Sequence, residues 1–92
     1  MPESLEDTIR VIYSNWQAFD ILVERLAEPG ENLNKLKTLY ELINIFNEIA
    51  MLFLDILTYE EQEQYPDISY RLSKALRFLF KHTSKKKHLA PV

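Results

Sequence analysis

Apolar side chains recur every three or four positions along most of this sequence, which is the spacing of one face of an α-helix. The pattern is clearest near the N-terminus, where steps of four and three alternate. Its members there are Leu5, Ile9, Ile12, Trp16, Phe19, Val23 and Leu26. No segment alternates apolar and polar residues with the period of two that is typical of a strand. We therefore predict an all-α fold.

A tight connection separates the first two expected helices. Ser4 opens an S-x-x-D capping pattern for a helix over 5–27, which Pro29 and its following glycine end. A second helix is expected over 33–57, with Asn32 as its N-cap residue. Two long helices joined by so short a turn form an antiparallel hairpin.

A shorter third helix is expected over 68–82, with Asp67 as its cap. Thr58 begins a T-x-x-E capping box, which leaves open a short fourth helix at 59–64. The remaining residues, 84–92, have no apolar period and are expected to form a flexible basic tail. The chain is therefore interpreted as one three-helix domain over 1–83, followed by that tail.

The helix expected over 33–57 carries two apolar stripes, and the shorter helix over 68–82 cannot cover both along their whole length. Exposed apolar stripes of this size mark interfaces, so we expect a homodimer or another homo-oligomer to complete the bundle. The alternative is a monomer whose later segments cover the stripe. Asn47 is a residue that would fix the register of two packed helices. The candidate interface comprises Leu42, Ile45, Asn47, Ile49, Leu52 and Ile56.

The net charge of −3 conceals two oppositely charged segments. Residues 1–67 hold all 14 acidic and four basic residues, for a charge of −10, whereas 68–92 hold seven basic residues and no acid, for +7. Three interpretations remain open: a solvated helix face, pairing with the acidic segment, or a surface for a polyanion. The candidate polyanion-binding residues are Arg71, Lys74, Arg77, Lys81, Lys85, Lys86 and Lys87.

The residues that carry most enzyme chemistry are scarce in this chain. It has no cysteine, one glycine, and only two histidines, His82 and His88, neither of which belongs to a metal-binding motif. We therefore expect no enzymatic activity, no metal and no cofactor. The longest wholly apolar run is six residues, so we expect no membrane span, and the acidic N-terminus favours a cytoplasmic location over secretion.

These features favour a protein-binding module, such as a small helical adaptor, chaperone or regulatory protein. We expect it to bind itself and an unidentified protein partner, with an amphipathic helix lying in a groove between the second and third helices. Three tyrosines gather where the acidic segment gives way to the basic one, and tyrosine is enriched in binding hot spots. They are Tyr59, Tyr65 and Tyr70. The alternative is a small nucleic-acid-associated regulator that uses the basic segment.

Overall fold

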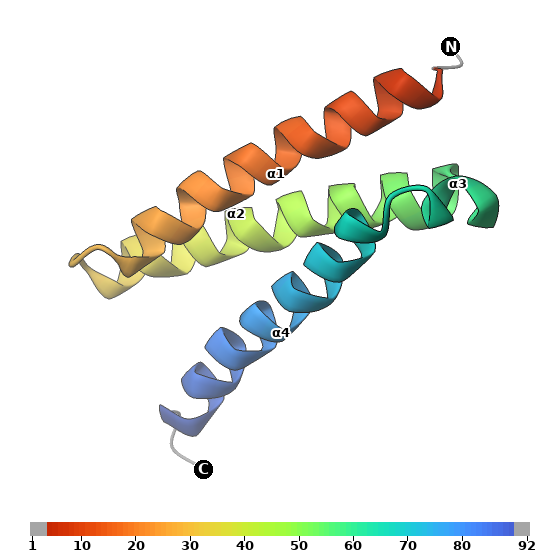
Figure 1. Cartoon of the computed structure of the whole chain (residues 1–92). Coiled ribbons are helices and arrows are strands. Elements are labelled where there is room, and N and C mark those ends of the chain that lie inside the picture. Colours follow the sequence, from red (N-terminus) through yellow and green to blue (C-terminus); the bar gives the residue numbers. More distant parts are fainter. Residues whose placement is uncertain (1–3, 90–92) are drawn as a thin grey trace.

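The computed structural model describes residues 4–89 of the chain, and side chains over residues 4–84. Every regular element in that range is helical, which confirms the all-α prediction (Figure 1). The elements are α1 (Leu5–Ala27), α2 (Asn32–Ala50), the π-helical segment η1 (Met51–Ile56), α3 (Tyr59–Glu63) and α4 (Pro66–Leu89).

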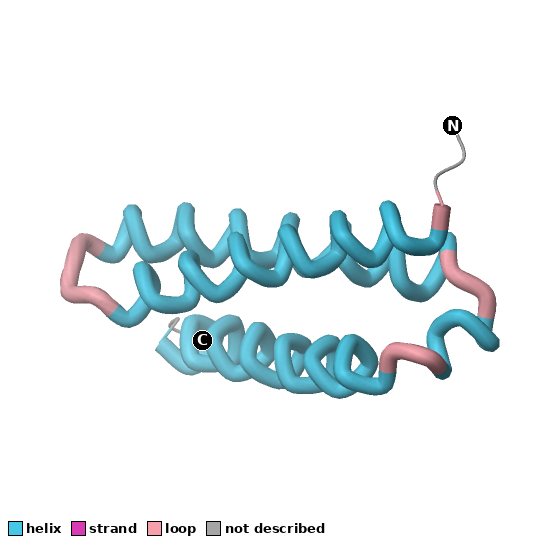
Figure 2. The backbone as a smooth tube through the Cα atoms, turned by 45° about the horizontal axis from the view of Figure 1, so that its top comes forward, coloured by secondary structure: helices cyan, strands magenta, loops and turns pink. Residues whose placement is uncertain are grey.

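The helices form an elongated bundle with extents of 46 × 23 × 22 Å. The helices α1 and α2 lie side by side as the expected antiparallel hairpin, and α4 returns along the hairpin at an angle to it (Figures 1 and 2). The helix expected over 68–82 starts earlier and continues to Leu89, so residues 84–89, expected in a tail, are helical.

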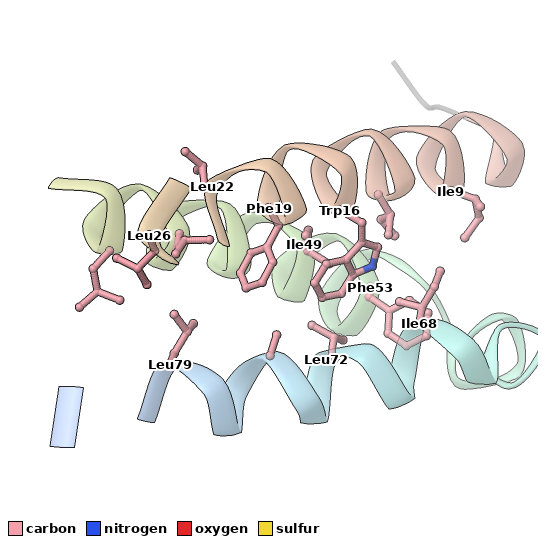
Figure 3. Packing of buried hydrophobic residues seen from close by; sticks show 14 of the residues in the cluster. Ile9, Trp16, Phe19, Leu22, Leu26, Ile49, Phe53, Ile68, Leu72 and Leu79 are labelled. Carbon is pink, nitrogen blue, oxygen red and sulfur yellow. The ribbon is translucent and has the colours of Figure 1, made fainter. Parts of the chain in front are cut away.

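The core lies where α1, α2 and α4 meet (Figure 3). The indole of Trp16 packs edge-to-face on the ring of Phe19, with 5.5 Å between ring centroids and an interplanar angle of 82°. Phe53, near the C-terminal end of the hairpin, and Ile68, near the start of α4, are completely buried in the same hydrophobic cluster. The spacing in α1 predicted its buried face well, although Leu22 is buried and Val23 only half-buried.

Local capping explains where the first helix and the short third helix begin. The Ser4 hydroxyl accepts a hydrogen bond from the backbone N–H of Asp7. At α3, the Thr58 hydroxyl accepts from the N–H of Glu61, whose carboxylate accepts from the N–H of Thr58. This complete capping box confirms the short helix that the sequence left open.

Two other expected caps differ from the structure. The N-cap residue of α2 is Glu31, without a side-chain hydrogen bond, and Asn32 is already helical. The helix α4 begins at Pro66, a residue suited to the first helical position because the N–H it lacks would have no intrahelical acceptor. Asp67 therefore lies inside the first turn of α4, where its carboxylate accepts a hydrogen bond from Tyr13 instead.

The buried residues of the second helix come from both predicted stripes, and the π-helical segment η1 forms its C-terminal end. The N–H of Leu57 donates to the carbonyl of Leu52, five residues earlier, so the turn holds more residues than an α-helical turn. Before η1 the completely buried residues include Leu42 and Ile49, from one predicted stripe. Within η1 the buried residue is Phe53, from the other stripe, to which buried Leu39 of α2 also belongs, while Ile56 is 61% exposed.

Polar contacts join α1 to α4 beside the core. The Tyr13 hydroxyl donates to the Asp67 carboxylate at 2.5 Å, and this hydrogen bond raises the pKa of Tyr13 to about 12. One α-helical turn further along α4, Arg71 donates to Asp20 at 2.7 Å, and its guanidinium lies 4.5 Å from the centroid of the Trp16 ring.

Candidate functional site

An apolar hollow lies between α2 and α4, on the side of these helices that faces away from α1. It has a volume of about 130 Å³. Its lining is almost wholly apolar and comes from Leu36, Leu39, Tyr40, Ile43 and Thr83. This is the pair of helices between which the sequence predicted a groove.

Exposed apolar residues extend the hollow along both helices. On the second helix the exposed apolar residues are three or four positions from the residues that line the hollow, so they lie on the same side of that helix. On α4, Leu76 and Phe80 precede Thr83 by seven and three positions, so these three residues also share one side of their helix. We call this surface the α2–α4 face. It comprises Leu33, Leu36, Tyr40, Ile43, Asn47, Met51, Leu76, Phe80 and Thr83.

The exposure of this face is high for apolar side chains. Tyr40 and Phe80 are each 63% exposed, Met51 is 53% exposed and Leu76 is 45% exposed. Contiguous apolar surface on a small protein marks a site of association. Asn47 is also exposed and lies within the apolar line of α2.

Charged residues flank the α2–α4 face. On the α2 side Glu48 is exposed next to Asn47, whereas exposed Lys37 and Glu41 lie toward α1, where they line a hollow with Arg25. On the α4 side Arg77 and Lys81 are exposed, four residues apart. The face therefore has a basic edge on α4 and an acidic residue, Glu48, at its edge on α2.

The six residues predicted as an interface do not form one surface. Leu42 and Ile49 are completely buried within the single chain and are not available to a partner. Ile45 is half-buried in a hollow on the α1 side of α2, and Leu52 is half-buried against the core. Only Asn47 and Ile56 are exposed, because the core takes residues from both predicted stripes, Leu42 and Ile49 from one and Leu39, Phe53 and Leu57 from the other.

The three tyrosines of the charge junction are also separated. Tyr59 is 84% exposed at the start of α3, whereas Tyr65 is half-buried and packs against the core. Tyr70 is exposed on α4, with the ammonium of Lys74 5.3 Å from its ring centroid. The structure therefore does not gather them into a single site.

The residues predicted to bind a polyanion do not all lie free on one surface either. Arg71 is engaged with Asp20 and Trp16, so it is already paired within the chain. Lys74, Arg77 and Lys81 are exposed on α4. The side chains of Lys85, Lys86 and Lys87 lie outside the described residues.

A larger hollow, of about 380 Å³, lies between α1 and α4. Its lining includes Trp16, Phe19, Tyr70 and Phe78, but the ion pair of Arg71 with Asp20 belongs to the same lining. Because this chain's own side chains link its two walls, it is a weaker candidate than the α2–α4 face.

Within the described part of the chain, no group of three or more His, Cys, Asp or Glu side chains is arranged to hold a metal ion. None of the described helices combines the length and apolarity needed to cross a membrane. Comparisons with protein-family models, with curated proteins and with solved structures found no match for this chain.

Proposed function

We propose that this chain is a non-enzymatic protein-binding module of the cytoplasm that acts as a homo-oligomer, and that the α2–α4 face is its binding surface. The observation that carries the proposal is the apolar hollow between α2 and α4, bordered by exposed Tyr40. Amphipathic helices bind in such grooves through apolar residues spaced by three or four positions.

Tyr40 is the expected anchor of this surface. Its ring lines the hollow and yet is 63% exposed, so a docked helix would desolvate it. Tyrosine contributes strongly to binding because it offers a large, rigid contact area with a polar end. The charged edges would orient the bound helix rather than supply most of the affinity.

A displayed library of amphipathic helical peptides provides the test. Peptides selected on the wild-type protein should lose about tenfold in affinity when Tyr40 is replaced by alanine, as measured by fluorescence anisotropy. Tyr59→Ala is the matched control, because Tyr59 is even more exposed but lies outside the face. Equal losses for the two variants, or a loss only for Tyr59→Ala, would refute the assignment of this face.

A nucleic-acid-associated regulator is the second candidate. Its support is the exposed row of Lys74, Arg77 and Lys81 on α4. If these residues bind phosphates, a labelled duplex should bind at low salt and be released steeply as salt rises, and replacing two of the three should reduce that salt dependence. The exposed acids of α2, close to the same surface, oppose this function because they repel a polyanion.

A further inference from the structure

We infer that the α2–α4 face is covered by a second copy of this chain, related by a two-fold axis that runs along the helices, so that α2 of each copy packs on α4 of the other. This inference rests on the proposed function and names the partner of the same surface, so a selected peptide and the second copy would compete for the face. It replaces the interface predicted from the sequence, whose central residues Leu42 and Ile49 are buried within one chain.

On this face α2 carries the residue pattern of a packed helix. Leu33, Leu36, Tyr40, Ile43 and Asn47 follow steps of three and four, which is the spacing of the a and d positions of helices that pack at shallow angles. Asn47 takes an a position of that pattern. When a second helix packs on such a pattern, a single asparagine at an a position specifies the register and the number of packed helices.

The α2–α4 face also complements itself in shape. Tyr40 and Ile43 of α2 and Thr83 of α4 line the same hollow, so these residues lie at about the same height along the two antiparallel helices. Phe80, 63% exposed and three residues before Thr83, is thus about level with Ile43. Rotation about a two-fold axis that runs along the helices does not change the height of a residue along that axis. Phe80 of the partner subunit therefore comes to lie over the hollow of the first copy.

The charges at the edges of the face also favour this arrangement. By the same alignment of heights, Arg77 is close in height to Glu48. When α2 packs on the partner's α4, Glu48 of each copy therefore lies on the same side as Arg77 of the other. Packing α2 on the partner's α2 would not bring these opposite charges together.

Sedimentation velocity over a wide concentration range tests the shape argument. The wild-type chain should sediment as a dimer of twice 10.9 kDa, and Phe80→Asp should sediment as a monomer. Ile21→Asp is the matched control, because Ile21 is 56% exposed on α1, away from this face, and this variant should remain dimeric. Circular dichroism shows whether both variants keep their helices. A dimer that survives Phe80→Asp would overturn the inference.

Charge reversal tests the arrangement of the two copies. Glu48→Arg and Arg77→Glu should each raise the dissociation constant about tenfold, since each change is present twice in the dimer. The double variant should return to within about threefold of the wild type, and Glu24→Arg on α1 should have no effect. Additive losses in the double variant would exclude the pairing of α2 with the partner's α4.

A wild-type chain that stays monomeric at every concentration would overturn the dimer. The proposed function would then still be judged by binding of selected helical peptides to the same face, so the two failures are distinguishable. Peptide binding with no dimer would leave the face assigned to another protein. If the chain neither dimerises nor binds the selected peptides, the α2–α4 face is not a binding surface.

Discussion

The Tyr13 hydroxyl donates a hydrogen bond to the Asp67 carboxylate, joining α1 to the first turn of α4 across 54 residues of sequence. The bond lies beside the core, near the point where α3 leads into α4 (Figure 1). It ties the start of α4 to α1 at the end of the hairpin from which α4 returns.

Tyr13→Phe should lower the free energy of unfolding by about 1 kcal/mol near neutral pH, because it removes an exposed hydrogen bond to a carboxylate. Folding raises the pKa of Tyr13 from 10.0 to about 12, so this stabilisation is complete below pH 10 and is lost as the pH rises toward 12. Urea unfolding at pH 7 and pH 11 should show a smaller difference between wild type and variant at pH 11. Tyr59→Phe, at an exposed position, should match the wild type at both pH values.

Arg71→Ala should destabilise the protein more than Asp20→Ala does. Both substitutions remove an exposed ion pair worth roughly 0.2–1 kcal/mol, but only the first also removes the guanidinium from the Trp16 ring, a contact worth about another 0.5–1 kcal/mol. A double-mutant cycle measured by urea unfolding isolates the ion pair. Its coupling energy should fall toward zero in 1 M salt, while the excess cost of Arg71→Ala persists. Equal costs for the two single variants would show that the ring contact contributes nothing.

Deleting Leu54 should preserve the fold. This exposed residue lies in η1, and its removal lets the π turn become α-helical. In the shortened chain, the spacing from Ile49 to Phe53 is four positions and that from Phe53 to Leu57 is three, so all three side chains stay on the buried side of an α-helix. The midpoint of thermal unfolding, followed by circular dichroism, should change by only a few degrees. Deleting exposed Asn44 is the control: it rotates Ile49 out of the core and should lower the midpoint severely. Similar losses for the two deletions would contradict this account of η1.

Ile49→Ala should cost about 2–5 kcal/mol in the free energy of unfolding, because it leaves a cavity at a completely buried position. Ile21→Ala removes the same atoms from a side chain that is 56% exposed and should cost under about 1 kcal/mol. Chemical denaturation of both variants at one protein concentration provides the comparison. A small cost at Ile49 would restore it as a candidate interface residue.

The sequence predicted the helical elements well because their signals are local. The capping pattern of Thr58 is complete in the structure, and the apolar spacing in α1 places Trp16 and Phe19 in the core. The predicted surfaces were less accurate. Leu42 and Ile49 were assigned to an interface because two stripes of equal quality run along 33–57, and helical periodicity does not say which one another helix covers.

The sequence did not locate the candidate face, because residues from both apolar stripes of 33–57 are buried and periodicity alone does not show which side of the second helix stays exposed. Two further features were not predicted. No residue pattern in Met51–Ile56 indicates the π turn of η1. The continuation of α4 to Leu89 was missed because no apolar period follows residue 83, although Lys and Arg are good helix formers.

By itself the sequence determined the all-α architecture, the antiparallel hairpin and the separation of charge between 1–67 and 68–92, since periodicity, turns and charge are properties of neighbouring residues. Tertiary structure alone decided which apolar residues remain exposed. That outcome depends on the rotation of α2 about its axis and on the angle of α4, which core packing and contacts such as that between Tyr13 and Asp67 fix.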